Sequence, residues 1–185
     1  MTIGYGSIIL RDFCEADITD YIRWMTEETA WQDWDAPWEK GLPFDAEQYR
    51  KMKLDALRQT AADANLRRSF EIGTRDHVHI GRVNAYLTDQ DYVWKHSTDG
   101  GFRYTLGIDL CESSYWHRGL GTEAFMAYIT YHRQHGIPEV FTQTWSGNLR
   151  MVRVAHKCGF SLVDRKPDTV SVCGKLYDSL TFALS

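Results

Sequence analysis

The sequence lacks the features that mark several classes of protein. No run of apolar residues approaches the roughly 20 that a membrane-spanning helix needs. Met1–Leu10 contains no basic segment followed by an apolar one, so we expect neither a secretory signal nor a membrane partner. Acidic residues outnumber basic ones by 25 to 21, and the net charge of −4 gives no general attraction to nucleic acid.

The sequence also lacks clustered cysteines and an evident set of metal ligands. His132 and His135 have helical spacing, but no third ligand of suitable geometry accompanies them, so we predict no metal site. The four cysteines form no CxxC pair, and this scatter predicts reduced thiols at Cys14, Cys111, Cys158 and Cys173. Together these absences predict a cytoplasmic protein.

What remains is an ordinary globular composition, with 43% apolar and 25% charged residues in a chain of 185, which predicts one domain over residues 1–185. Apolar spacing predicts helices over Glu15–Thr26, Phe44–Asn65, Gly119–His135 and Asn148–Cys158. Alternation and β-branched content predict strands over Ser7–Arg11, Ser69–Thr74, Ile80–Leu87, Phe102–Leu110, Val140–Trp145, Ser161–Asp164, Val170–Cys173 and Ser179–Leu184. Loops are expected over Trp31–Pro43 and Thr88–Gly101. This order favours an α/β fold with a mixed sheet and helices on its faces.

The most informative segment leads from a strand through a turn into the helix near Gly119. Glycines at 119 and 121 leave room for a ligand to approach backbone N–H groups at the helix N-terminus, where the helix dipole also favours an anion. Arg118 adds a positive charge that can pair with phosphate. The same Gly-x-Gly can also serve a tight turn alone, and the fragment does not separate the two interpretations.

Two other phosphate motifs fit this segment less well. A Walker A loop needs a lysine before its Ser or Thr, and Thr122 follows a glycine instead. A dinucleotide-binding fingerprint matches the spacing of Gly119, Gly121 and Ala124, but it expects an acidic residue at the end of a second strand. Glu139 precedes that strand. A dinucleotide-dependent oxidoreductase is therefore disfavoured.

Longer segments resemble the GNAT N-acetyltransferase superfamily. Tyr115-Trp-His-Arg-Gly-Leu-Gly-Thr-Glu-Ala124 is similar to its acyl-CoA pyrophosphate loop. The segment from Thr144 to Phe160 is similar to the Asn-x-x-Ser and Lys-x-Gly-Phe pattern of the branch containing the ribosomal-protein N-terminal acetyltransferases. Leu10-Arg11 with Asp17 resembles the opening strand and helix, and Gly174–Asp178 resembles the final hairpin. The resemblance covers nearly the whole chain.

The resemblance implies a twisted, mostly antiparallel sheet flanked by helices, with a splayed strand pair forming an acyl-CoA cleft. Ile108 and Leu110 would offer backbone groups to the pantetheine arm. Asn148 would contact acetyl-CoA, the co-substrate, although asparagine at a helix start is also a common N-cap. The pyrophosphate would be held by the amides of Arg118, Gly119, Leu120, Gly121 and Thr122.

The implied reaction is direct attack of an amine on the thioester of acetyl-CoA in a ternary complex. Asp109, on the strand face opposite Ile108 and Leu110, and Glu112 are the candidate bases, because each is near the end of the strand where the cleft would open. A backbone N–H near Leu110 or Cys111 would stabilise the oxyanion. The proton donor is unassigned, because the positions where relatives carry Tyr and Ser are Ala155 and Met151.

The acceptor side is expected in the segment between the first two helices. Thr29–Glu39 contains three tryptophans and three carboxylates, and Trp31, Trp34 and Asp35 are its candidate substrate-binding residues. Aromatic faces and carboxylates suit a small-molecule amine or a peptide N-terminus, but the same tryptophans could simply pin a loop. Exposed aromatics leave a homodimer open. A non-catalytic acyl-CoA sensor is the alternative function, because both expected proton donors are missing.

Overall fold

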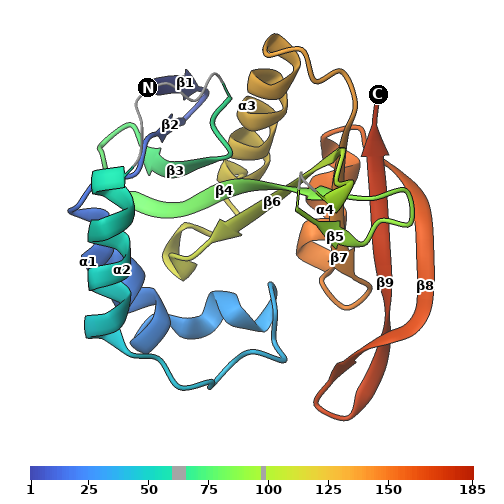
Figure 1. Ribbon diagram of the computed structural model, residues 1–185, viewed down its shortest axis with the longest axis horizontal. Helices are drawn as coiled ribbons and strands as arrows, with labels where there is room; N and C mark the ends of the chain where they lie inside the picture. Colours follow the sequence, from blue (N-terminus) through green and yellow to red (C-terminus); the bar gives the residue numbers. More distant parts are fainter. Residues whose placement is uncertain (60–65, 97–98) are drawn as a thin grey trace.

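One sheet extends through the computed structural model, which describes residues 1–59, 66–96 and 99–185 (Figure 1). Its strands are β1 (Thr2–Tyr5), β2 (Ile8–Arg11), β3 (Ser69–Thr74), β4 (His79–Thr88), β5 (Trp94–Lys95), β6 (Arg103–Leu110), β7 (Val140–Trp145), β8 (Ser161–Val172) and β9 (Lys175–Leu184). Their order is β1-β2-β3-β4-β6-β7-β9-β8, with β5 beside β4. Every pair is antiparallel except β6 with β7, which is parallel. The α/β fold with a mostly antiparallel sheet is confirmed.

The parallel pair β6 and β7 separates almost as soon as it forms. Its ladder contains one register pair, Thr105 with Phe141. The hydroxyl of Thr142 also donates to the Leu106 carbonyl at 2.8 Å, beside that pair. The other edge of β6 stays paired with β4 as far as Leu110. The splayed strand pair that the resemblance implied is therefore present, and the free edge of β6 faces the opening.

The helices cover the sheet through two buried clusters. They are α1 (Asp17–Thr26), α2 (Ala46–Gln59), α3 (Leu120–Gln134) and α4 (Leu149–Lys157), with 3₁₀ helices η1 (Thr29–Asp33) and η3 (Ser113–Tyr115). The buried side of α3, including Phe125 and Tyr128, joins the larger core with residues of β2, β3, β4 and β6. Tyr21 and Trp24 of α1 form a smaller cluster with Cys111. Within the described residues, no helix has both the length and the apolar character needed to cross a membrane.

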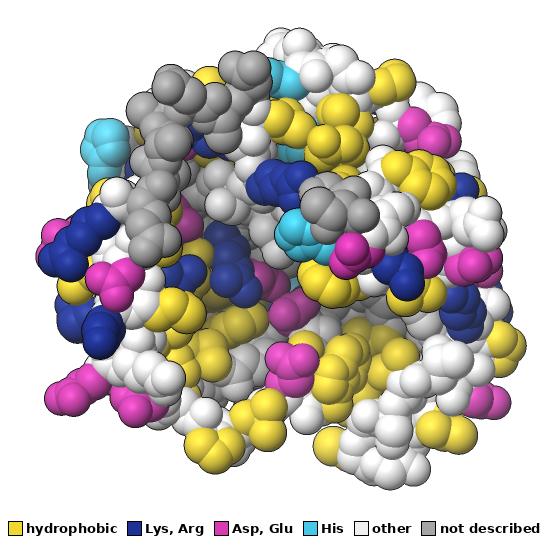
Figure 2. Space-filling view, viewed as in Figure 1, with side chains coloured by type: hydrophobic (Ala, Val, Ile, Leu, Met, Phe, Trp, Pro, Cys, Tyr) yellow, Lys and Arg dark blue, Asp and Glu magenta, His cyan; other side chains and the backbone are white. Residues whose placement is uncertain are grey.

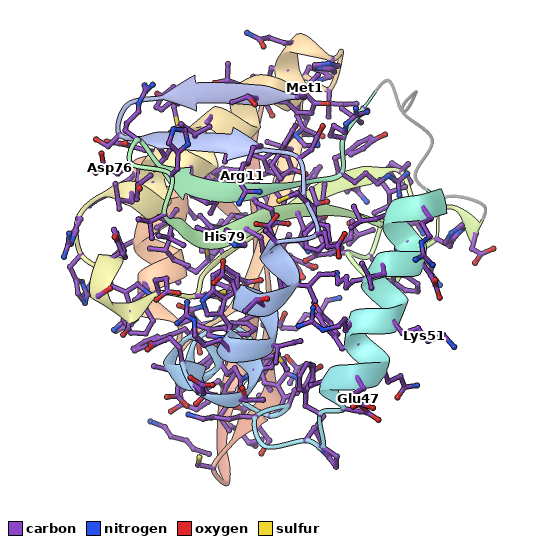
Figure 3. All side chains as sticks on the ribbon, turned by 90° about the vertical axis from the view of Figure 1, so that its left-hand side faces the viewer. Met1, Arg11, Glu47, Lys51, Asp76 and His79 are labelled. Atoms are coloured by element: carbon purple, nitrogen blue, oxygen red, sulfur yellow. The ribbon has the colours of Figure 1, made fainter. Side chains whose placement is uncertain are left out.

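A network of ion pairs fixes α1 to the sheet (Figure 3). Arg11 donates to both oxygens of Asp17, at 2.7 and 2.6 Å. The imidazole of His79 lies between Glu71, 2.9 Å from Nε2, and Asp20, 3.0 Å from Nδ1. Burial opposes the charge on His79, but these carboxylates outweigh burial and raise its pKa.

The same network contains a group of possible metal ligands, which the sequence did not indicate. Ligand atoms of Asp17, Asp20 and His79 lie within 4.8 Å of one another. Each of the two most buried members already has another partner: Asp17 binds Arg11, and His79 binds Glu71. The prediction that the protein holds no metal is left untested by this arrangement.

The sequence predictions differ from the structure mainly at the chain ends and in the loops. β1 lies in a stretch for which the sequence predicted no element. The two strands predicted over Ser161–Asp164 and Val170–Cys173 are one strand, β8, whose register against β9 shifts at two places. The loop predicted over Trp31–Pro43 begins inside η1. Positions 60–65 of the second predicted helix and positions 97–98 of the predicted connection lie outside the described residues.

Candidate active site

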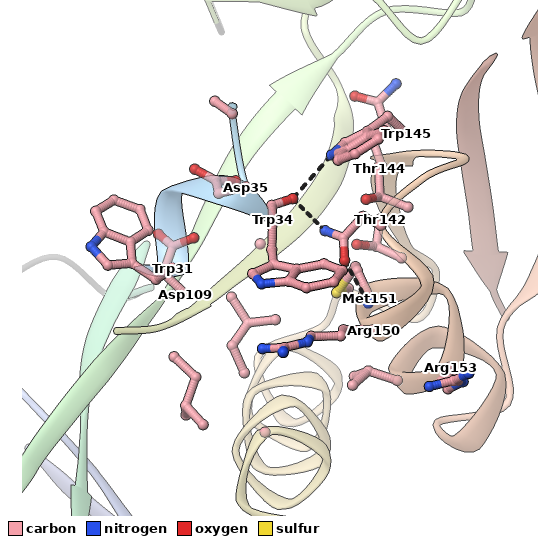
Figure 4. A pocket seen from close by; sticks show the side chains of 18 of the residues that line it. Trp31, Trp34, Asp35, Asp109, Thr142, Thr144, Trp145, Arg150, Met151 and Arg153 are labelled. Carbon is pink, nitrogen blue, oxygen red and sulfur yellow. Dashed lines mark hydrogen bonds between the residues drawn. The ribbon is translucent and has the colours of Figure 1, made fainter. Parts of the chain in front are cut away.

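The opening between β6 and β7 is a cleft with a volume of about 730 Å³ (Figure 4). Its walls come from β6, β7, the start of α3, the exposed side of α4 and the segment that follows α1. Figure 2 shows the molecule hollowed near its centre, with hydrophobic, basic and acidic side chains gathered around the hollow. One cavity therefore brings together several parts of the chain that are far apart in sequence.

One wall of the cleft includes the start of α3. Gly119 is the N-cap residue, with a φ of 83° that favours glycine, and no side chain caps this helix end. The first helical N–H groups, at Leu120, Gly121 and Thr122, therefore lack partners in the preceding turn. Gly119, Gly121 and Thr122 line the cleft. The arrangement is an anion cradle at a helix N-terminus.

The packing around Gly121 shows that this cradle has room for a ligand. A Cβ atom built on Gly121 would meet only Ile108 Cδ1, at 3.9 Å, and one built on Gly119 would meet nothing within 4 Å. The space in front of these glycines is thus not taken up by the protein. The side chain of Leu120 packs into the core, so only its backbone can face a ligand. Arg118 is exposed and lies over the Tyr115 ring, outside the cleft lining.

Ile108 and Leu110 line the cleft along the free edge of β6. The N–H of Cys111 donates to the Ile80 carbonyl at 2.9 Å, so it is not available as an oxyanion donor. Backbone groups alternate between the two edges of a strand, and the N–H of Leu110 therefore points away from β4, into the cleft. The Leu110 carbonyl on this edge accepts a hydrogen bond from Trp116 Nε1 at 2.7 Å.

Asn148 lies in the cleft wall, and both ends of its amide are engaged. Its Oδ1 accepts the N–H of Met151 at 3.0 Å, which confirms the N-cap interpretation. Its Nδ2 donates to the carbonyl of Trp34 at 2.6 Å, and Trp145 Nε1 donates to the same carbonyl at 3.0 Å. Asn148 thus anchors the segment after α1 to the start of α4. Its contact with a co-substrate stays a prediction.

A stacked arginine provides a second anchor that the sequence analysis missed. The guanidinium of Arg150 lies 4.0 Å from the ring centroids of both Trp34 and Trp116. Burial lowers the pKa of Arg150. This stack joins the residue that follows η1, helix α4 and the loop before α3 across the cleft. The three residues come from distant parts of the chain, and no local pattern marks them as partners.

The two predicted bases have different surroundings. Asp109 lines the cleft, is 8% exposed, and accepts a hydrogen bond from Arg82 Nε at 2.8 Å. Glu112 is not part of the lining; it forms an ion pair with Arg23 and accepts Trp24 Nε1 at 2.6 Å. Glu112 is therefore placed where it holds α1, and its catalytic role has no geometric support. Asp109 remains a candidate.

Trp31, Trp34 and Asp35, the candidate substrate-binding residues, all line the cleft (Figure 4), and their contact with an acceptor stays a prediction. Surrounding protein raises the pKa of Asp35 to about 7, with Asp109 adding to the rise and Arg82 opposing it. The Asp35 side chain is nevertheless exposed toward the open cleft. Its charge is therefore sensitive to whatever fills that space.

The structure supplies no proton donor at the two positions where relatives carry one. Ala155 is fully buried in the core and Met151 lines the cleft with a thioether. His156 and Tyr177, the nearest donors in sequence, are outside the lining. Among described residues, the lining does contain hydroxyl groups from β7 and β9, at Thr142, Thr144 and Ser179.

A mostly antiparallel sheet that splays at its one parallel pair, with an anion cradle beside the opening, defines an α/β protein with a cleft suited to an anionic ligand. The chain belongs to the GNAT acetyltransferase family: the family model described as "Acetyltransferase (GNAT) domain" matches residues 7–161. Acetyl transfer is the general activity of this family. No curated protein matches the sequence.

Solved structures share the fold over nearly the full chain. RimL, a ribosomal L7/L12 alpha-N-protein acetyltransferase solved with coenzyme A, superposes with a TM-score of 0.71 at 15% identity, covering 100% of this chain and 97% of RimL. The ribosomal-protein-S5-alanine acetyltransferase from Vibrio fischeri gives a TM-score of 0.72 at 15% identity, with 100% and 96% covered. YncA of Salmonella typhimurium, solved with acetyl-CoA, gives 0.65 at 14% identity, with 97% and 94% covered.

Proposed function

We propose that the protein transfers an acetyl group from acetyl-CoA to a primary amine of a small molecule or a peptide N-terminus, by direct attack in a ternary complex. The observation that carries this proposal is one continuous cleft. It has the anion cradle at Gly119–Thr122 in one wall and the aromatic, acidic pocket at Trp31, Trp34 and Asp35 in another. Two substrates bound there would meet along the free edge of β6.

The cradle end suits the phosphates and pantetheine of acetyl-CoA. Free amides at the start of α3 face the cleft, and Arg153 and Lys157 of α4 add positive charge to the same lining. The edge of β6 at Ile108 and Leu110 can pair with the amides of an extended arm. Acetyl-CoA supplies the thioester carbonyl that the amine attacks. The N–H of Leu110 would then donate to the oxygen of that carbonyl.

The pocket end suits an amine. Indole faces attract cations, and a carboxylate without a basic partner pairs with an ammonium. Two of the structural neighbours are named for acetylating ribosomal proteins, RimL at an alpha-amino group and the Vibrio fischeri protein at an alanine. Those names support a peptide N-terminus as one acceptor class, while the indoles and the carboxylate of the pocket suit a small amine equally.

A second candidate function is a sensor that binds acyl-CoA without catalysis. The observation in its favour is that Ala155 and Met151 offer no proton donor for the leaving thiolate. Thiolates leave readily without a donor near neutral pH, because a thiol has a pKa of about 8.5. The lack of a donor therefore slows turnover without abolishing it, and we favour the enzyme.

Two measurements test the proposal in sequence. Acetyl-CoA or CoA at about 100 times its dissociation constant should raise the melting temperature by roughly 5–10 °C, whereas NADH should not. Stabilisation by NADH alone would reject both candidate functions. Release of free CoA with a library of amines then separates the enzyme, which releases thiol only when an acceptor is present, from the sensor, which releases none.

A further inference from the structure

Two carboxylates face the same space in the cleft but have different partners. Asp109 is bound to Arg82, whose Nε lies 2.8 Å from Oδ2. Among the described residues, the Asp35 carboxylate has neither a hydrogen bond nor an ion pair, and it points into the cleft from the segment after η1. Figure 4 draws both carboxylates between the indoles of Trp31 and Trp34. One carboxylate is thus charge-balanced and the other is free to take a new partner.

We propose that Asp35 is the catalytic residue that accepts the proton of the acceptor ammonium, that the Arg82–Asp109 pair positions this site without exchanging protons, and that the acceptor carries one ammonium there. This inference rests on the proposed acetyl transfer and narrows it. It assigns the base to the segment between α1 and α2, whereas the sequence pattern pointed to the end of β6.

Asp109 and Asp35 differ in what protonation would do to their surroundings. Protonating Asp109 would leave the Arg82 guanidinium without its partner, and breaking a poorly solvated pair on one side is costly. Protonating Asp35 breaks no bond in the protein and relieves repulsion from Asp109. The groups that act on Asp35 are Asp109 of β6, Arg82 and Tyr86 of β4, and Glu39 of its own segment. Of these, Arg82 alone favours the charged form.

The proton and electron balance of the reaction fits one base. The acceptor R–NH₃⁺ gives a proton to the Asp35 carboxylate and becomes a neutral amine. A bond forms between the amine nitrogen and the thioester carbon, and the carbon–sulfur bond breaks with its electron pair on sulfur. The second nitrogen proton passes to that sulfur, giving the acetamide and free CoA thiol. Asp35 then returns its proton to water.

The shape of the site indicates the acceptor class. A second cavity of about 410 Å³ shares Trp31, Asp35 and Ala36 with the main cleft. Most of its lining is uncharged and includes Met25, Leu42 and Pro43, although Glu39 and Lys40 also contribute. An amine could place its ammonium at Asp35 and its stem along this cavity. Because Arg82 neutralises Asp109, Asp35 offers one negative charge, which suits one ammonium with an uncharged stem.

The test compares variants with three probe amines and acetyl-CoA. The probes are n-butylamine and L-alaninamide, with one ammonium each, and 1,4-diaminobutane, with two. In the wild type, kcat/KM should decrease as the pH is lowered, with a midpoint near pH 7, and this decrease is the acidic limb of the pH profile. The value of kcat/KM should be higher for the two probes that carry one ammonium than for the diamine. Asp35→Asn should lower kcat about 100-fold or more and remove the acidic limb, and Asp35→Glu should restore part of both.

Matched variants separate this role from its alternatives. Asp33→Asn removes the same charge from an exposed aspartate that lines neither cavity, although its partner Lys40 lines the second, and it should keep the wild-type pH profile. His117 is another ionisable side chain in the cleft lining. If Asp35 is the base, His117→Asn should keep the acidic limb. Asp109→Asn should move that limb to lower pH, because it removes a like charge and frees Arg82.

The outcomes distinguish the two proposals. If Asp35→Asn keeps its kcat and its acidic limb while the wild type turns over amines, Asp35 is not the base and acetyl transfer stands. If Asp35→Asn raises only KM, Asp35 binds the ammonium without taking its proton, and the assignment is again wrong. If the wild type releases no CoA with any probe, the proposed function fails and the base assignment with it. Carbon-13 NMR of the labelled aspartate carboxyls measures the Asp35 titration directly in the wild type and in each variant that retains Asp35.

Discussion

Gly121 shows at the scale of one residue how the fold leaves space for a ligand. Glycine within a helix costs roughly 0.5–1 kcal/mol relative to alanine. The described packing does not require it, because an added Cβ would reach only Ile108 Cδ1 at 3.9 Å. A glycine that weakens the helix without improving the packing is explained by a bound group that comes close to the backbone.

The first residue-scale prediction is therefore a pair of opposite effects from Gly121→Ala. The free energy of unfolding without ligand should rise by about 0.5–1 kcal/mol, because the helix loses a glycine. The affinity for CoA should fall, because the methyl group occupies the cradle. Urea unfolding measures the first effect and titration calorimetry the second. An alanine variant that binds CoA as tightly as the wild type would remove Gly121 from the cradle.

The charged version of this substitution gives a larger effect. Gly121→Glu places bulk and negative charge where we expect a pyrophosphate, and it should abolish CoA binding in calorimetry. Thr130→Glu is the matched control, since Thr130 lies exposed on the same helix, away from the cleft lining. Equal loss in both variants would indicate damage to α3 in general and not to the cradle.

Individual residues also show where sequence reasoning stops. Gly119 and Gly121 could be interpreted locally, because a helix start and its glycines are adjacent in the chain. Asp109 and Glu112 were both candidate bases, because nothing in the sequence places Arg82 beside one and Arg23 beside the other. Partners from distant segments decide which carboxylate faces a substrate, and one sequence does not contain that information.

At the scale of elements, the stack of Trp34, Arg150 and Trp116 holds η1 against α4. Each cation–π contact contributes about 0.5–1 kcal/mol when partly exposed. Arg150→Ala should therefore lower the free energy of unfolding by roughly 1–2 kcal/mol and change the tryptophan fluorescence, because two indoles lose a shared neighbour. Arg150→Lys should recover little, since a lysine lacks the planar group that stacks on both rings.

Arg153→Ala is the control for this stack. Arg153 lies on the same helix and in the same cleft lining, but no ring contact is present at it in the described structure. Its removal should leave the fluorescence unchanged. If both variants gave the same spectrum and the same stability, the stack would have no part in holding η1.

Elements with a strong internal pattern were the ones that the sequence predicted well. β3, β4, β6, β7, α3 and α4 have regular apolar spacing, and their predicted ranges agree with the structure to within about two residues. β1 was missed because its four residues are mostly exposed and carry no alternation. β8 was divided in two because Pro167 and Asp168 interrupt its pattern; the structure accommodates them in a register shift against β9.

At the scale of the whole molecule, the segment that shapes the acceptor pocket depends on how α1 joins the sheet. His79 of β4 links Glu71 of β3 to Asp20 of α1, and Arg11 of β2 links to Asp17. Burial alone would raise the pKa of Asp17. The hydrogen bonds from Arg11 and from the Cys14 N–H outweigh burial, and the pKa of Asp17 is lowered. The docking of α1 is thus partly ionic, which makes it dependent on pH.

The protonation of His79 sets the direction of that dependence. Its pKa is raised in the folded protein, so the charged form stabilises the fold. This contribution is complete below the unfolded value of about 6.5 and is lost as pH rises through the higher folded value. His79→Gln should lower the free energy of unfolding by roughly 2–3 kcal/mol near pH 6, and the difference from wild type should shrink on the alkaline side. Urea unfolding from pH 5.5 to 9 measures both. The control is His77→Asn, an exposed change two positions earlier, which should show the same pH dependence of stability as the wild type. If the loss of unfolding free energy in His79→Gln stayed constant with pH, packing and not charge would hold α1.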